Sequence, residues 1–220
     1  MEIEDDQNII SKSSQRFFKS NISCDYLLEI LKIYSQYKRD INFFDFGANN
    51  IDNYIYINKN LPELNYYYYD QESYISVIEK IFKEYNFENF TIIKEVYLSN
   101  LNLDFAFFGS SLQYLKNFED ILKQFIKNKA EYIFISQTPF YNSPEFSHNL
   151  IMKQVNVAEQ IFYLYFFNYD RFVQIFEKGD YKLIFSKSNT NTKFLNFKNF
   201  ERTYHSINML DILFKYISKK

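Results

Sequence analysis

The chain of 220 residues is poor in the residue types that usually build metal and redox sites, with one cysteine, two histidines and no tryptophan. Cys24 cannot form a disulfide within the chain, and so few cysteines and histidines exclude a structural zinc site made from these ligands. We therefore expect a reducing compartment and no bound metal.

Glycine and long apolar runs are also scarce. With three glycines the chain has no GxGxxG fingerprint for a dinucleotide pyrophosphate, which makes NAD and FAD poor candidates as cofactors. No segment reaches the roughly 18 uninterrupted apolar residues that a membrane span needs. The first residues, MEIEDDQNII, are acidic and lack the apolar core of a signal peptide. We expect a cytoplasmic protein without a transmembrane segment.

Charge is balanced, with 25 Lys and Arg against 27 Asp and Glu and a net charge of −2. Such a chain has no overall field to attract a phosphate backbone, so we expect no nucleic-acid partner. No linker rich in Pro, Gly or Ser divides the sequence. We therefore expect one domain over 1–220, with an N-terminal helical extension at 1–40, a core at 41–187 and a C-terminal extension at 188–220.

Short apolar runs alternate with helical patterns along the chain. Strands are expected at 41–46, 65–70, 91–96, 105–108, 132–136 and from 181 onwards. Helices are expected at 22–38 with Ser23 as N-cap, from Ser73 as N-cap to 85, at 118–126, and from Asn168 to Gly179 as the C-terminal glycine. The spacing of Met209, Leu210, Leu213 and Tyr216 predicts a last helix. This alternation predicts an α/β fold with parallel strands and right-handed crossovers.

Three groups of residues fall at the carboxyl ends of predicted strands, where open parallel sheets bind ligands. They are Asp45–Asn50, Asp70 with Gln71, and Gly109–Ser111. Gly47 can adopt a positive φ and lets a ligand approach the main chain. The alternative is an ordinary tight turn after a strand.

Asp70 ends the second strand about 23 residues after Gly47. At this offset a carboxylate can accept hydrogen bonds from both hydroxyls of an adenosine ribose. A solvated aspartate at a strand end is the alternative. A ligand that contains adenosine but no phosphate needs fewer glycines in the loop, and S-adenosylmethionine is such a ligand.

Several segments together resemble a known family. They are FFDFGANN, the DQ that follows YYYY, DFAFFGSSLQYLKNFEDIL, IFISQTPF and FNYDRFVQIFEKGDYKLIFS. Over roughly residues 41–187 the chain resembles a family of class I methyltransferases encoded among bacterial surface-polysaccharide biosynthesis genes. The resemblance is strongest at SLQYL (111–115) and QTP (137–139).

This resemblance implies a Rossmann-like class I methyltransferase fold, with a seven-stranded, mostly parallel sheet flanked by helices and S-adenosylmethionine over the first strands. The cofactor-binding residues that it implies are Asp45, Gly47, Ala48 and Asn49 for the methionine part, Asp70 with Gln71 for the ribose, Asn100 for the adenine, and Gly109, Ser110 and Ser111 for the methionine side of the pocket. The turn reads GANN where the family has two or three glycines.

Methyl transfer is an in-line displacement, for which a general base is helpful but not required. His148 follows the fifth predicted strand and is the candidate base, with Glu145 and Tyr141 as competitors and a solvated loop histidine as the alternative. His205 has less positional support. Residues 139–156 are expected to form a substrate lid.

The function predicted from the sequence is an S-adenosylmethionine-dependent methyltransferase that acts on a sugar or glycan intermediate of surface-polysaccharide biosynthesis. The partners expected are a small-molecule or glycan substrate, and a homo-oligomer remains open. A non-catalytic methyltransferase-like module with a degenerate cofactor loop is the alternative, supported by the GANN turn. An NAD-binding oxidoreductase is a third hypothesis.

Overall fold

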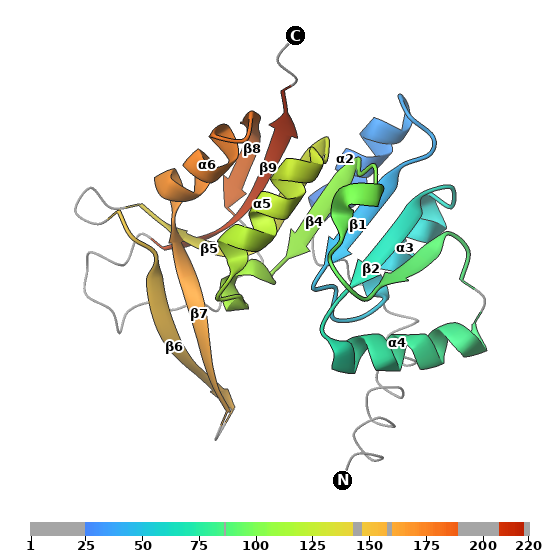
Figure 1. Cartoon of the computed structure of the whole chain (residues 1–220), viewed down its shortest axis with the longest axis horizontal. Helices are drawn as coiled ribbons and strands as arrows, with labels where there is room; N and C mark the ends of the chain where they lie inside the picture. Colours follow the sequence, from blue (N-terminus) through green and yellow to red (C-terminus); the bar gives the residue numbers. More distant parts are fainter. Residues whose placement is uncertain (1–24, 86, 143–146, 158–159, 189–206, 218–220) are drawn as a thin grey trace. The chain divides into compact units, whose positions relative to one another are not determined.

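The computed structural model describes residues 25–85, 87–142, 147–157, 160–188 and 207–217. The chain divides into two compact units, Met1–Phe105 and Ala106–Lys220, which are described one after the other (Figure 1). Strands and helices alternate along both units, which confirms the predicted α/β class. None of the described helices is long and apolar enough to cross a membrane.

Unit 1 contains a three-stranded parallel sheet whose strands are joined by helices. Its elements are α2 (Asp25–Ser35), β1 (Asn42–Phe46), α3 (Asp52–Asn60), β2 (Asn65–Tyr69), α4 (Glu72–Glu84), β3 (Phe90–Ile93) and the 3-10 turn η1 (Leu98–Asn100). β2 lies between β1 and β3 and pairs in parallel with both. The carboxyl ends of β1 and β2 therefore lie side by side, because Phe46 pairs with Tyr69.

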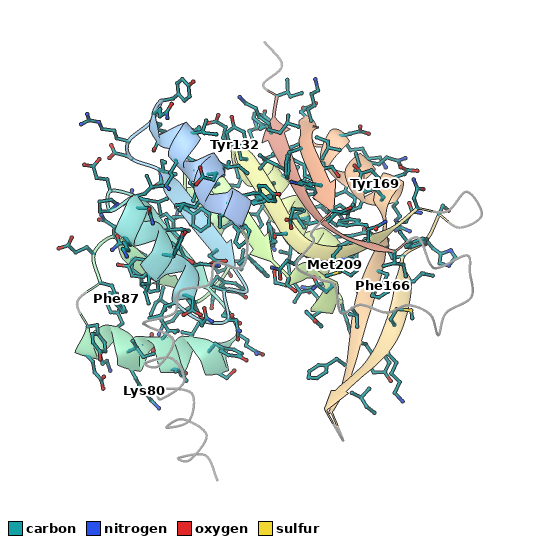
Figure 2. The ribbon with its side chains drawn as sticks, turned by 180° about the vertical axis from the view of Figure 1, so that it is seen from behind. Lys80, Phe87, Tyr132, Phe166, Tyr169 and Met209 are labelled. Carbon is teal, nitrogen blue, oxygen red and sulfur yellow. The ribbon has the colours of Figure 1, made fainter. Side chains whose placement is uncertain are left out.

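Aromatic rings fill much of the core of unit 1. The Phe90 ring stacks on that of Tyr66 with 5.6 Å between centroids, and the Tyr54 ring meets Phe90 edge-on at 4.7 Å. Phe87, labelled in Figure 2, closes this cluster against Tyr54. Tyr66 and Tyr68 are fully buried, so the tyrosine run of β2 serves mainly in core packing, as predicted.

A buried carboxylate holds α2 to the sheet of unit 1. Asp104 is 4% exposed and accepts hydrogen bonds from Lys38 Nζ at 2.5 Å, from the Asn42 N–H at 2.8 Å and from the Tyr34 hydroxyl at 3.2 Å. A buried acid is stable only when its oxygens are paired in this way.

We expect Asp104→Ala to lower the free energy of unfolding by about 3 kcal/mol, because the change leaves the Lys38 ammonium and the Asn42 N–H without their acceptor. Urea denaturation measures this loss. Asp40 is exposed, and Asp40→Ala should change stability by less than about 0.5 kcal/mol. Equal losses in the two variants would show that Asp104 has no special structural role.

Unit 2 is built around the long strand β5. Its elements are β4 (Phe105–Gly109), which starts at the boundary, η2 (Leu112–Tyr114), α5 (Phe118–Asn128), β5 (Tyr132–Tyr141), β6 (Leu150–Val157), β7 (Gln160–Asn168), α6 (Tyr169–Glu177), β8 (Tyr181–Ser188) and β9 (Asn208–Tyr216). β5 pairs with β4, with the end of β7 in parallel and with β9 in antiparallel orientation. β6 and β7 form an antiparallel ribbon (Figure 1).

The segment predicted to be a substrate lid, 139–156, is largely sheet. Its first residues extend β5, and β6 begins at Leu150. The base of the ribbon packs into a small apolar cluster of Tyr141, Leu164, Phe166 and Ile207, with Phe166 labelled in Figure 2. The expectation of a loop was wrong over these strand residues, because Pro139 is tolerated beside a bulge of β5 and β6 has an aromatic-rich partner strand in β7. A role of the segment as a substrate lid stays a prediction.

The C-terminal apolar stretch is strand β9, and the predicted helix from Met209 to Tyr216 was wrong. Ile212, Leu213 and Phe214 are all buried in succession, which fits a strand covered on both faces. β9 pairs with β5 along one edge and with β8 along the other. The segment forms a strand because it pairs with β5 and β8, whereas its local residue spacing alone had favoured a helix.

One of the predicted helix N-caps is confirmed and another is wrong. The Asn168 side chain accepts the Arg171 N–H at 3.0 Å, which confirms the predicted cap of α6. For α4, however, the N-cap is Gln71, and Ser73 lies inside the helix. The predicted cap Ser23 lies outside the described residues.

Gly179 directly follows Lys178, the C-cap of α6, where the sequence predicted a helix-ending glycine, but its backbone is not left-handed. The left-handed residue is Asp180, with φ of 62°. A Cβ on Gly179 would lie 2.2 Å from Ile126 Cγ2, so glycine is needed for α5 and the end of α6 to pack closely. The absence of a side chain, rather than backbone freedom, explains this glycine.

We expect Gly179→Ala to destabilise the protein by about 1–3 kcal/mol through overpacking. In an Ile126→Ala background the same change should cost much less, because the clashing methyl group is gone. A double-mutant cycle in urea measures the coupling. The same loss in both backgrounds would exclude the contact as its cause.

Candidate functional site

The loop after β1 makes a sharp turn with two left-handed residues. Gly47 has φ of 67° and Asn49 has φ of 62°. The Asn50 N–H donates to the Ala48 carbonyl at 2.6 Å, the bond that closes a three-residue γ-turn. Asparagine is among the few residues with a side chain that tolerate this backbone region. The GANN sequence therefore makes a turn for which glycines are usual.

Asp70 fastens this loop to the end of β2. Its Oδ2 accepts the Asn49 N–H at 2.5 Å, and its Oδ1 accepts the Gln71 N–H at 2.6 Å. The Gly47 N–H also donates to the Tyr69 carbonyl at 2.8 Å. The structure thus brings together Asp70, Gln71 and the loop, three of the features that the sequence placed at adjacent strand ends.

The Asp70 carboxylate is partly buried and lies at the start of α4. Burial raises its pKa, and the N–H groups of Gln71 and Asn49 oppose the rise. The N-terminal end of a helix also favours a negative charge. Because each carboxylate oxygen can accept more than one hydrogen bond, both oxygens can still accept from a ligand hydroxyl.

Asp45 lies beneath the loop, inside the core of unit 1, and is 1% exposed. The Tyr66 hydroxyl donates to its Oδ2, and so does the Asn53 amide at 3.0 Å. Burial raises the pKa of Asp45 to about 6, against the effect of these two hydrogen bonds. The carboxylate joins α3 and β2 to the strand that enters the loop. Direct contact of Asp45 with a cofactor stays a prediction.

Sequence reasoning missed α3 and with it Asn53. The pattern that could have revealed the helix is the pair Asn50 and Asp52. The Asn50 Oδ1 accepts the Asp52 N–H at 2.9 Å, and its amide donates to the Asp52 carboxylate at 2.9 Å. Such a short-range polar pair marks a helix start even where the following Tyr and Ile residues favour strand.

Asn100 and Tyr68 are two further residues of unit 1 that bear on this site. Asn100, predicted to contact adenine, is exposed in η1 and is not among the residues that hold the loop. Tyr68 has a buried hydroxyl without a hydrogen-bond partner. Burial raises the pKa of Tyr68, and the charges of Asp70 and Asp45 add to the rise. The sequence had assigned Tyr68 only to core packing, although its hydroxyl is polar and interacts electrostatically with Asp70 and Asp45.

In unit 2 the predicted residues Gly109, Ser110 and Ser111 follow β4. A Cβ on Gly109 would lie 2.8 Å from the Phe107 ring, which leaves room only for glycine. Ser110 has a left-handed φ of 54°, and its N–H donates to the Ser136 carbonyl at 2.9 Å. Ser111 is the N-cap of η2.

The candidate base His148 is exposed and lies between β5 and β6. The Tyr141 hydroxyl donates to the His148 backbone carbonyl. Tyr141 is 1% exposed, so its ring belongs to the core and its hydroxyl holds the loop. The other competitors, Glu145 and His205, lie outside the described residues.

Comparison with known proteins gives structural matches only. No protein-family model matches the sequence, and no curated protein does. The N-terminal domain of EvdMO1, solved with S-adenosylhomocysteine and D-fucose, matches with a TM-score of 0.60 at 8% identity, over 86% of this chain and 82% of that domain. An S-adenosylmethionine-dependent methyltransferase from Clostridium acetobutylicum matches with a TM-score of 0.55 at 12% identity, over 96% of this chain and 99% of that one.

The chain has a class I methyltransferase fold. This confirms the predicted fold class. A third match, the cyclase SpnF, has a TM-score of 0.61 at 6% identity, over 89% of this chain and 82% of that one. Since a cyclase has a similar fold, the architecture alone does not identify the reaction.

Proposed function

We propose that the chain is an S-adenosylmethionine-dependent methyltransferase that acts in the cytoplasm on a sugar or sugar-linked intermediate of surface-polysaccharide assembly. One observation carries the cofactor half: Asp70 is bonded to a left-handed loop at the carboxyl ends of two adjacent parallel strands. The substrate half rests on the family resemblance, and the EvdMO1 structure, which was determined in the presence of D-fucose, suggests a first acceptor to try.

Within unit 1 the roles follow from the chemistry of each group. Asp70 accepts hydrogen bonds from the ribose hydroxyls with the remaining lone pairs of its oxygens. The backbone of Gly47, Ala48 and Asn49 contacts the methionine part, and Asp45 keeps β1 and α3 in place beneath it. Gln71 lies beside the Asp70 carboxylate that binds the ribose, and Asn100 binds the adenine. In unit 2, Gly109, Ser110 and Ser111 keep their predicted role at the methionine.

The bound cofactor supplies an electrophilic methyl group, and the protein orients the acceptor and takes its proton. We assign the proton to His148. With D-fucose as acceptor probe, His148→Gln should lower the rate of S-adenosylhomocysteine release about 100-fold or more. Its affinity for S-adenosylhomocysteine should be unchanged. An unchanged rate would assign the proton to solvent.

Calorimetric titration of the full chain separates the three functional hypotheses. We expect micromolar binding of S-adenosylmethionine and S-adenosylhomocysteine and no heat with NADH. Binding of NADH instead would favour an oxidoreductase. No binding of any of these at millimolar concentration would rule out the enzyme.

That last outcome would favour a non-catalytic methyltransferase-like module. Two observations support this second candidate. Ala48 and Asn49 carry side chains where glycines are usual, and both Asp70 oxygens already accept a backbone N–H in the structure.

A further inference from the structure

Two residues with left-handed backbone follow β4 and interrupt β5 in unit 2, and neither is a glycine. Ser110 has φ of 54° and Gln137 has φ of 50°. Such conformations are unfavourable for residues with side chains and persist only where the surroundings enforce them, commonly at binding sites. The hydrogen bond from the Ser110 N–H to the Ser136 carbonyl, at 2.9 Å, connects the two segments.

A buried acid from β9 holds the distorted part of β5. The Asp211 Oδ1 accepts the Ser136 hydroxyl at 2.7 Å and the Gln137 N–H at 2.9 Å. Asp211 is 1% exposed. The pairing of β5 with β9 shifts register between Ile135 and Thr138, as in a β-bulge. Bulges of this kind redirect side chains and occur often next to active sites.

The Gln113 side chain bridges the two left-handed residues. Its Nε2 donates to Ser110 Oγ at 2.8 Å and, more weakly, to the Gln137 carbonyl at 3.4 Å. A carbonyl can only accept, so the amide nitrogen must face Gln137. The Gln113 Oε1 is then left buried without a hydrogen-bond partner, and the residue is 2% exposed. The orientation of this acceptor is therefore fixed, and it is unpaired.

The neighbour of Gln113 on η2 is exposed to solvent. Tyr114 is 46% exposed. Burial raises the pKa of the Tyr114 hydroxyl, and the Gln113 amide beside it opposes the rise. Because Tyr114 is the next residue along η2, we expect a ligand group to approach the Gln113 amide from this exposed side of unit 2.

We infer that Gln113 Oε1 binds a hydrogen-bond donor of the methyl acceptor, a hydroxyl or amino group, and that the SLQYL and QTP segments are built to hold it there. The nature of the ligand rests on the proposed function. Natural proteins rarely leave a buried polar atom unpaired, and such an atom selects strongly for a ligand that supplies the missing partner. The site would reject an acceptor whose hydroxyl at this position is already methylated, because a methoxy group has no hydrogen to donate.

The test uses the full chain with saturating S-adenosylhomocysteine and follows D-fucose and D-glucosamine by ligand-observed NMR. Gln113→Met keeps the volume and removes the amide, and Gln124→Met makes the same change at an exposed position of α5. We expect Gln113→Met to weaken binding at least tenfold while its thermal midpoint stays within a few degrees of that of the wild type. Gln124→Met should bind like the wild type.

Loss of binding for D-fucose assigns the donor as a hydroxyl, and loss for D-glucosamine alone assigns it as an amine. Binding of both sugars to Gln113→Met with wild-type affinity would overturn the inference. So would no binding of either sugar to the wild type, or a thermal midpoint several degrees lower in Gln113→Met, which would make Gln113 structural. Failure of the wild type to bind S-adenosylhomocysteine would instead contradict the proposed function.

Discussion

Asp70→Ala is expected to weaken S-adenosylhomocysteine binding by roughly ten- to a hundredfold. The change removes the charge-assisted hydrogen bonds to the ribose, which together contribute about 1.5–3 kcal/mol. It also frees the Asn49 N–H that Asp70 accepts at 2.5 Å, so the loop loses its attachment to β2. Both effects act in the same direction on cofactor affinity.

Calorimetry with two ligands separates the effect on the ribose from that on the loop. Adenosine should lose affinity for Asp70→Ala, whereas 2′,3′-dideoxyadenosine, which lacks both hydroxyls, should bind the variant and the wild type about equally. Glu63 is exposed before β2, and Glu63→Ala is the matched control. If adenosine binds Asp70→Ala as well as it binds the wild type, Asp70 is not the ribose acceptor.

Asp45→Asn is expected to change how the stability of the protein depends on pH. The pKa of Asp45 rises from 3.8 to about 6 on folding. Between these values the folded chain holds a proton that the unfolded chain has lost, so stability falls as pH rises. The shift corresponds to about 3 kcal/mol. This contribution is fully present below pH 3.8 and is lost above about pH 6.

Asparagine carries no charge and can still accept the Tyr66 hydroxyl with its oxygen. The free energy of unfolding of the wild type minus that of Asp45→Asn should therefore be about 2–2.5 kcal/mol lower at pH 7.5 than at pH 4. Urea denaturation at the two pH values measures the difference. The exposed control Asp40→Asn should show little pH dependence. A difference between wild type and Asp45→Asn that is constant with pH would mean that Asp45 titrates normally.

Local sequence predicted those elements that have a clear apolar pattern. β1, β4 and α5 begin within a residue of their predicted starts, because β1 and β4 are nearly continuous apolar runs and α5 has a regular apolar face. α3 was missed because its Tyr and Ile residues favour strand, while its start depends on Asn50 and Asp52. β9 was misassigned because its strand character comes from β5 and β8, which are distant in sequence.

In the candidate site, too, the local features could be predicted and the long-range contacts could not. The carboxylate of Asp70 and the turn at Gly47 could be placed together from their offset and from the parallel pairing of β1 with β2. The bulge of β5 could not, since its holding bond joins residues 74 apart in sequence, Gln137 and Asp211. Asp211 stood inside a stretch predicted to be helix, so nothing in the local pattern connected it to QTP.

A crystal structure of the full chain grown with S-adenosylhomocysteine is the most direct measurement of the central claim, that Asp70 and the loop from Gly47 to Asn49 form a nucleoside site. We expect both ribose hydroxyls within hydrogen-bond distance of the Asp70 carboxylate, with Asn49 still left-handed. Adenosine bound elsewhere, or Asp70 bonded only to the backbone while the ligand is present, would contradict the claim.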